Sequence, residues 1–309
     1  MNELLSHLTS ARPATIDSLT ALVSRGREVA ERFALPFDRA VIGGYEADRV
    51  AYAFGAGYQA ALAQLLPDLA PDRVRVFCVS EEGGGHPRAI ATRIERRGRD
   101  GLFLDGKKKW TTFGPLADEL LVVATSGVDD AGRNQLKLVR VDARREGVTV
   151  HPMPPTPFAP ELPHAELTFA GVRVAEDELQ EGDAYERFVK PFRTVEDVHV
   201  LGAFVGHVAG MARAHALPPE LFEEALAIVG ALRSLAPLPA LAPETHVALA
   251  GALQLVRALG GRVDACWGAD AGEPHARWTR DRALLEVAGG ARAKRLASAR
   301  ERLSRSVER

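Results

Sequence analysis

The sequence predicts an α+β fold in which a β-rich module lies between two groups of helices. Apolar residues recur with helical spacing up to residue 72, alternate with a period of two from 73 to 180, and return to helical spacing from 181 onward. Few folds segregate their elements in this order. We therefore expect an N-terminal helical domain (1–72), a central antiparallel β-barrel or sandwich (73–180) and a C-terminal helical bundle (181–309).

The N-terminal domain is expected to contain helices over residues 14–33 and 46–66. In each range, apolar side chains fall on one helical face. Pro67 and Pro71 end the region, because proline cannot continue a helix.

The central domain is predicted from seven short runs, most of them bounded by Gly, Asp or Pro. The runs are "RVRVFCVS", "AIATRIER", "GLFLDGKKKWTT", "ELLVVAT", "QLKLVRV", "VTVHP" and "AELTFAGVRV". Such closely spaced strands are typical of a barrel or sandwich. The segment from His151 to Pro163 carries six prolines, so we expect an extended surface loop there.

The C-terminal bundle is expected to begin with a long helix over residues 184–215. Further helices are predicted over 217–232, 244–268 and 276–306. The glycine pairs at 260–261 and 289–290 lie within these patterns, and we interpret them as points of close helix packing. The arginine-rich end keeps helical spacing of its apolar residues, so it is interpreted as the solvated face of an amphipathic helix.

The composition is that of an ordinary globular protein, with 46% hydrophobic and 26% charged residues. A net charge of −2 provides no field that would attract nucleic acid. The two cysteines, Cys78 and Cys266, exclude a disulfide framework and fit a cytoplasmic compartment. We expect no signal peptide, no membrane span and no metal site, because no suitable apolar run or ligand cluster is present.

The stretch "GKKKWTTFG", Gly106 to Gly114, places an aromatic ring and two hydroxyls at the end of a charged strand. Trp110 and Thr112 are two residues apart, so on an extended chain they face the same side. An indole and hydroxyl groups suit a planar heterocycle that is apolar on its faces and polar along one edge. Taken alone, Trp110 could equally be a core or hairpin-capping aromatic.

The central domain resembles the middle domain of the acyl-CoA dehydrogenase family. That family has Thr/Ser-Glu-Pro-Gly-x-Gly-Ser-Asp after its first strand, where this chain has "SEEGGGHP" from Ser80. It then has Asn-Gly-x-Lys-x-Trp-Ile-Thr/Ser-Asn-Gly, which "DGKKKWTTFG" resembles, with matches at Gly106, Lys107, Trp110, Thr112 and Gly114. An Ala-Asp pair before an apolar strand and a closing "LTFAGVRV" run follow in the family's order.

The resemblance implies a flavin cofactor, FAD in the family. By resemblance, Ser80, Trp110 and Thr112 are the flavin contacts, and His86 is placed where the family approaches the phosphates. The family's Gly-Ser-Asp reads Gly85, His86 and Pro87 here, and Pro87 has no N–H to donate. FMN, or no flavin at all, therefore stays open as an alternative.

The C-terminal part departs further from the family. It lacks the Arg-Lys-x-Phe-Gly motif, the Gly-Gly-x-Gly-Tyr stretch and the terminal Glu-Gly-Thr. The resemblance therefore implies a divergent member with shortened helical domains. Some branches carry the catalytic Glu on the first long C-terminal helix, about ten residues before a Gly-x-x-Gly patch, and Glu196 has that position.

Glu196 is thus the candidate base that takes the α-proton of a substrate. The neighbouring acid, Asp197, leaves open that both are merely a helix surface. His199 and His207 lie on the same predicted helix and are interpreted as interior or surface residues without a catalytic role.

The resemblance implies a flavin-dependent oxidoreductase that removes an α-proton and a β-hydride from an acyl-CoA or other acyl thioester. Electrons would pass to a carrier flavoprotein or to oxygen, and a homodimer or other homo-oligomer is expected. The alternative is a catalytically degenerate relative, a binding or partner-subunit protein without tightly bound FAD.

Overall fold

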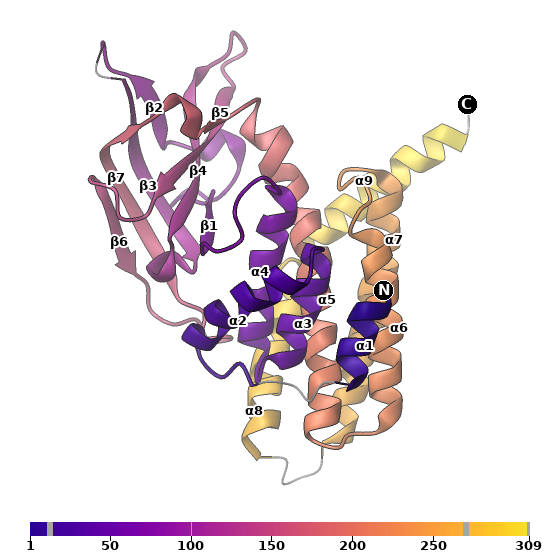
Figure 1. The fold of residues 1–309 in the computed structure, drawn as a ribbon. Helices are drawn as coiled ribbons and strands as arrows, with labels where there is room; N and C mark the ends of the chain where they lie inside the picture. The colour runs from indigo at the N-terminus through magenta and orange to yellow at the C-terminus, as the bar shows by residue number, and fades with distance from the viewer. Residues whose placement is uncertain (11–14, 100, 268–271, 308–309) are drawn as a thin grey trace. The chain divides into compact units, whose positions relative to one another are not determined.

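The computed structural model describes residues 1–10, 15–99, 101–267 and 272–307. The chain divides into two compact units. A helical unit comprises Met1–Pro71, Pro157–Glu161 and Phe192–Arg309, and a sheet unit comprises Asp72–Thr156 and Leu162–Pro191. Each unit is described in turn (Figure 1).

Helices form within each predicted range, but the helices over residues 2–10 and 36–46 were not predicted, and two predicted ranges are interrupted. The helices are α1 (Asn2–Ser10), α2 (Leu19–Arg32), α3 (Pro36–Glu46), α4 (Val50–Leu65), α5 (Lys190–Ala214), α6 (Pro219–Leu235), α7 (Pro243–Cys266), α8 (Gly272–Asp281) and α9 (Gly289–Val307). The range predicted as one helix over 46–66 begins in α3 and restarts as α4. The range 276–306 is also interrupted, by a 3₁₀ turn over Arg282–Glu286. None of these helices is long and apolar enough to cross a membrane.

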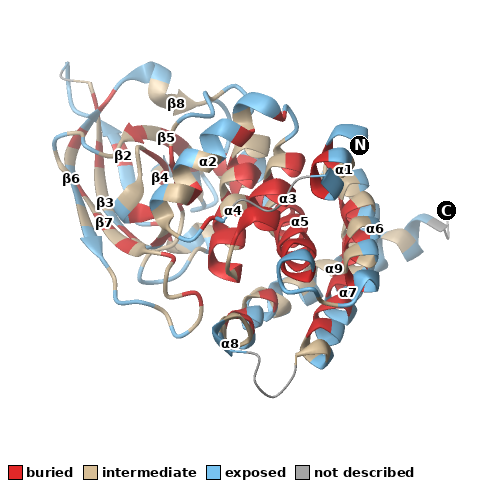
Figure 2. Cartoon of the chain, turned by 60° about the horizontal axis from the view of Figure 1, so that its bottom comes forward, coloured by how far each residue is buried: buried red, intermediate tan, exposed pale blue. Residues whose placement is uncertain are grey.

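The centre of the helical unit is the contact between α3 and α5, whose residues are mostly buried (Figure 2). A Cβ built on Gly206 of α5 would lie 2.2 Å from the carbonyl oxygen of Val41, and one on Gly210 would lie 2.1 Å from that of Tyr45. From the other side, a Cβ on Gly44 would lie 1.9 Å from the carbonyl oxygen of Ala203. The two backbones therefore approach so closely that only glycine fits at these positions.

The glycine pairs that we interpreted as packing points behave differently. A Cβ on Gly261 or Gly290 would meet no atom within 4 Å, and one on Gly260 would make only ordinary contact with Trp278 at 3.8 Å. Gly289 is the first residue of α9. The interpretation was therefore wrong for Gly261 and Gly290, because periodicity cannot show which face of a helix another backbone approaches.

The sheet unit contains an eight-stranded sheet of order β6-β7-β3-β2-β4-β5-β8, with β1 paired to β4. The strands are β1 (Arg75–Cys78), β2 (Arg93–Arg96), β3 (Leu102–Thr112), β4 (Glu119–Val128), β5 (Asn134–Asp142), β6 (Val148–Pro152), β7 (His164–Val174) and β8 (Leu179–Gln180). All seven predicted runs form strands. The pairing is mixed, however, because β1 and β2 both run parallel to β4. The long connections that separate these strands in sequence allow parallel pairing.

The proline-rich segment after β6 differs from the expected surface loop. Ala159 is buried, and its N–H donates to the carboxylate of Asp281 at 2.7 Å. Glu161 accepts hydrogen bonds from Arg49 and Arg280 of the same helical unit. The few residues here that are not proline therefore anchor the segment, Ala159 through its N–H and Glu161 through its side chain.

We predict that Gly206→Ala destabilises the protein by about 2–4 kcal/mol, because the added methyl group overpacks the contact between α3 and α5. Gly251→Ala on α7 is the matched control, since its Cβ would meet no atom within 4 Å. The control should be neutral or up to about 1 kcal/mol more stable, through helix propensity. Urea unfolding of both variants measures the difference, and equal stabilities would contradict the packing argument.

Candidate functional site

Trp110 lies near the end of β3, where the pairing with β7 is interrupted. The register shifts between Lys108 and Thr111, and Trp110 has a φ of 60°, in the left-handed region. Its side chain is 53% exposed, whereas Lys108 and Thr111 are buried. The assumption of an extended chain at Trp110 was therefore wrong. The bulge turns the indole outward, and the alternative of a core tryptophan is excluded.

The turn that follows Trp110 is held by bonds to the start of β7. The Thr111 hydroxyl donates to the carbonyl of Ala165 at 2.6 Å, and the N–H of Phe113 donates to the carbonyl of Pro163 at 2.8 Å. Phe113 is buried although its φ is 63°. A Cβ on Gly114 would lie 2.6 Å from the Ala165 side chain, so glycine is required there. These contacts stabilise a backbone conformation that is unfavourable for a non-glycine residue.

His164, at the start of β7, is a residue that the sequence did not single out. Its ring meets the Trp110 indole edge-on, with centroids 6.1 Å apart, and it pairs across the strands with Thr112. Nδ1 of His164 lies 3.1 Å from the carbonyl oxygen of Leu162. Burial lowers the pKa of His164, so the ring is neutral at pH 7. No sequence signal could place His164 here, because the contact depends on strand pairing.

Ser80 lies on the loop after β1, next to the bulge of β3. Its carbonyl oxygen accepts the N–H of Lys109 at 2.8 Å, which ties the loop to the residue before Trp110. A Cβ on Gly85 would lie 3.3 Å from the Ser80 hydroxyl, so the loop folds back over this side chain. The structure therefore brings together Ser80 and the backbone that carries Trp110.

A buried ion pair fixes this loop against β3. Lys108 is 1% exposed, and its Nζ donates to Glu81 at 2.7 Å and to the carbonyl of Val79 at 3.2 Å. The Glu81 carboxylate also accepts the N–H groups of Ala91 and Thr92. Burial alone would raise the pKa of Glu81, but Lys108 and these N–H groups outweigh burial and hold the pKa below its usual range. Burial lowers the pKa of Lys108, and the charge and hydrogen bond of Glu81 oppose this shift. The two side chains thus form a buried, hydrogen-bonded pair.

His86 is exposed on the same loop and begins a 3₁₀ turn, Pro87–Ala89. Its Nδ1 accepts the N–H of Arg88 at 3.3 Å, so the ring proton is on Nε2. Asn134 donates to the carbonyls of Pro87 and Ile90, which holds the turn from outside. His86 thus offers one N–H donor from a well-defined loop.

Glu196 belongs to the helical unit, on α5, and is half-buried. Loss of solvent raises its pKa to about 7, and the adjacent Asp197 adds to the shift, while Arg292 and Arg295 oppose it. Among the described residues, none donates a hydrogen bond to the Glu196 carboxylate. The group therefore has the protonation behaviour of a general acid or base near neutral pH.

Asp197 has a different role from its neighbour. It is buried and accepts hydrogen bonds from Arg292, at 2.7 and 2.9 Å, and from Arg295, both on α9. The alternative that the two acids form a solvated helix surface is thus wrong for Asp197. The acid holds α9 against α5.

His199 and His207, also on α5, are buried as interior residues. Nδ1 of His199 bonds to the carbonyl of Val195 at 2.8 Å, and Nδ1 of His207 bonds to that of Ala47 at 2.9 Å. Burial lowers the pKa of each to about 4. Both rings are therefore neutral at pH 7, as expected for interior histidines. Among the residues that the structure describes, no cluster of three His, Cys, Asp or Glu side chains could hold a metal ion.

Comparison with known proteins now identifies the sheet unit. Residues 76–172 match the sequence profile of "Acyl-CoA dehydrogenase, middle domain". Over these residues the sheet unit is similar to that domain. No curated protein sequence matches the chain.

Solved structures extend the likeness to nearly the whole chain. FkbI, described as acting in biosynthesis of the methoxymalonyl extender unit of a polyketide, is 18% identical with a TM-score of 0.65, over 99% of this chain and 98% of its own. Butyryl-CoA dehydrogenase from Megasphaera elsdenii is 12% identical with a TM-score of 0.69, over 96% and 94%. The FAD complex of PigA is 12% identical with a TM-score of 0.67, over 96% and 92%. The predicted acyl-CoA dehydrogenase fold is confirmed.

The middle-domain motif can now be aligned with the structure. In Asn-Gly-x-Lys-x-Trp the lysine stands two residues before the tryptophan, which is Lys108 and not the exposed Lys107. The assignment of Lys107 to the motif was therefore wrong. The buried lysine of this sheet unit pairs with the glutamate of the first motif, so the two motifs are one structural feature.

We predict that Lys108→Met destabilises the protein by about 2–4 kcal/mol, because it leaves the Glu81 carboxylate buried without its cation. Lys107→Met, on the exposed neighbour, is the control and should change stability by less than about 0.5 kcal/mol. The double variant Lys108→Met/Glu81→Gln should recover part of the loss. Chemical denaturation measures all three, and a Lys108→Met variant as stable as Lys107→Met would refute the pairing.

Proposed function

We propose that this protein is a flavin-dependent oxidoreductase of the acyl-CoA dehydrogenase type, acting on an acyl-CoA or related acyl thioester. The observation that carries the proposal is the Trp110 indole, exposed on a strained bulge beside the Ser80 loop in a unit similar to that middle domain. An exposed indole on a strained backbone has no packing purpose of its own. The FAD complex of a similar fold supports FAD as the cofactor.

The residues present fit the ring end of a flavin. The indole of Trp110 offers a flat apolar surface, and the half-buried Ser80 and Thr112 offer hydroxyl groups for a polar edge. His86 offers one N–H toward a phosphate. A bound flavin would supply the acceptor for the substrate's β-hydride.

In the proposed reaction, the ionised carboxylate of Glu196 accepts the α-proton of the thioester. A pKa of about 7 keeps a large fraction ionised at neutral pH while leaving the group basic enough to accept a carbon-bound proton. Asp197, bonded to Arg292 and Arg295, keeps α5 in place while Glu196 changes charge. Trp110 would cover a bound flavin ring and exclude water from it. Electrons then pass to a carrier flavoprotein or to oxygen, and we propose a cytoplasmic homo-oligomer.

A second function has a specific observation in its favour. Pro87 and the locally bonded His86 replace the Ser and Asp that the family presents to the nucleotide, and the Arg-Lys-x-Phe-Gly motif is missing from the sequence. A protein that keeps the fold as a binding or partner subunit, without tightly held FAD, would also have these features.

We predict that the purified protein binds FAD and that Trp110→Ala weakens binding about 5- to 150-fold, since stacking on a flat heterocycle contributes about 1–3 kcal/mol. Trp267→Phe in the helical unit is the control and should bind flavin as the wild type does. Titration with FAD and FMN, followed by absorbance and calorimetry, gives the affinities. A colourless protein that binds neither flavin would support the partner-subunit function instead.

We predict that Glu196→Gln lowers kcat/KM by about 10²–10⁴-fold, the usual contribution of a positioned base, while flavin affinity is unchanged. Wild-type kcat/KM should rise with pH through about 7, because only the ionised carboxylate accepts a proton.

Glu223→Gln, on an exposed position of α6, is the matched control. The assay is anaerobic reduction of the bound flavin by acyl-CoA thioesters. Full turnover by Glu196→Gln would remove Glu196 as the base without removing the flavin assignment.

A further inference from the structure

The helical unit contains a cavity of about 370 Å³ between α5, α7 and α9. Its walls are largely apolar, with Leu201 from α5, Leu249 and Leu253 from α7, and Leu296 from α9. The volume lies within the range of small-molecule sites, roughly 300–1,000 Å³. The cavity belongs entirely to the helical unit, so it is separate from the residues around Trp110.

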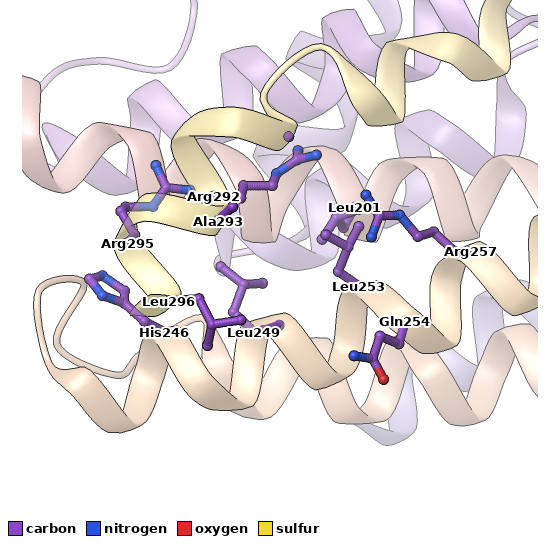
Figure 3. A pocket seen from close by; sticks show the side chains of 12 residues that line it. Leu201, His246, Leu249, Leu253, Gln254, Arg257, Arg292, Ala293, Arg295 and Leu296 are labelled. Carbon is purple, nitrogen blue, oxygen red and sulfur yellow. The ribbon is translucent and has the colours of Figure 1, made fainter. Parts of the chain in front are cut away.

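Three arginines stand around this apolar space. Figure 3 shows the α7 and α9 leucines between Arg295 on one side and Arg257 on the other, with His246 near Arg295. Arg257 is occupied by a two-pronged pair with Glu286, at 2.8 and 2.5 Å. Arg292 and Arg295 share one carboxylate, that of Asp197.

Arg292 and Arg295 share the Asp197 carboxylate, and Glu196 is a second acid on which both arginines act. The side chains of Arg292 and Arg295 are only 14% and 20% exposed, so water screens them poorly. Arg292 also donates to the carbonyl of Leu285, whereas Arg295 has no further recorded partner among the described residues. Arg295 already pairs with Asp197, but a half-buried guanidinium whose remaining N–H donors face an apolar cavity is costly unless an acceptor accompanies them.

We propose that this cavity binds an amphipathic carboxylate, with its hydrocarbon tail among Leu249, Leu253 and Leu296 and its head group on Arg295. The tail replaces water in the apolar space, and the head group accepts the N–H donors that Arg295 leaves unused. Arginine suits this role because its planar donors match a carboxylate. Arg292 and Arg295 line the cavity and also hold Asp197 beside Glu196. The proposal nevertheless concerns ligand binding alone and is tested without flavin, so its outcome is separate from that of the flavin reaction.

The test is calorimetric titration of the full-length protein with sodium decanoate at pH 7.5, without added flavin. We expect one decanoate per chain, and at least tenfold weaker binding of decan-1-ol and of decylammonium. Arg295→Gln should remove most of the preference for decanoate over decan-1-ol. Arg300→Gln, an exposed position of the same helix, should keep it.

A second pair of variants tests the place of binding without touching charge. Ala250→Leu projects into the cavity from α7 and should weaken decanoate binding at least tenfold. Ala248→Leu, exposed on the same helix and outside the cavity lining, should leave it unchanged. No decanoate binding, equal binding of decanoate and decan-1-ol, or wild-type binding by Ala250→Leu would each overturn the proposal.

Discussion

The glycine contact between α3 and α5 is the constraint on which the helical unit depends. Gly206 and Gly210 lie on one face of α5, and the carbonyls of Val41 and Tyr45 occupy the space where side chains would be. Such a contact fixes both the distance and the rotation of α5, since any turn of the helix would place a larger residue against α3. The direction of every other side chain on α5 follows from that rotation.

The side chains of Glu196, Asp197 and His199 show how the rotation of α5 sets the direction of each residue. His199 points toward the Phe37 ring of α3, with centroids 5.9 Å apart, and is kept neutral. Asp197 points toward the arginines of α9 and accepts hydrogen bonds from them. Glu196 lies between these directions, and burial and the adjacent Asp197 raise its pKa to about 7 against the opposing charges of Arg292 and Arg295. One helix rotation thus gives these three residues different environments.

The sequence predicted the strands well and the site incompletely, for physical reasons. Alternation of apolar residues is a local property, so seven of the eight strands of this sheet were predicted, and the two-residue β8 was missed. The bulge at Trp110 is set by pairing of β3 with β7, and the burial of Asp197 is set by arginines on a helix almost a hundred residues away. Neither partner can be read from the neighbouring sequence. The break before α9 was missed because its apolar spacing continues through the 3₁₀ turn.

His86 and Pro87, which depart from the family motif, lie in the part of the loop that follows Gly85. Glu81 and Lys108 anchor the loop where Ser80 stands, and this end has several buried hydrogen bonds. Beyond Gly85 the loop is held by the contact of His86 with Arg88 and by Asn134 of β5, and Pro87 removes one backbone donor. If a flavin binds here, the rigid end is the one that meets the ring, and the end with fewer donors meets the phosphates. Binding energy in such a site comes mainly from the face of the ring, which makes the exposed indole, rather than the phosphate contacts, the decisive residue.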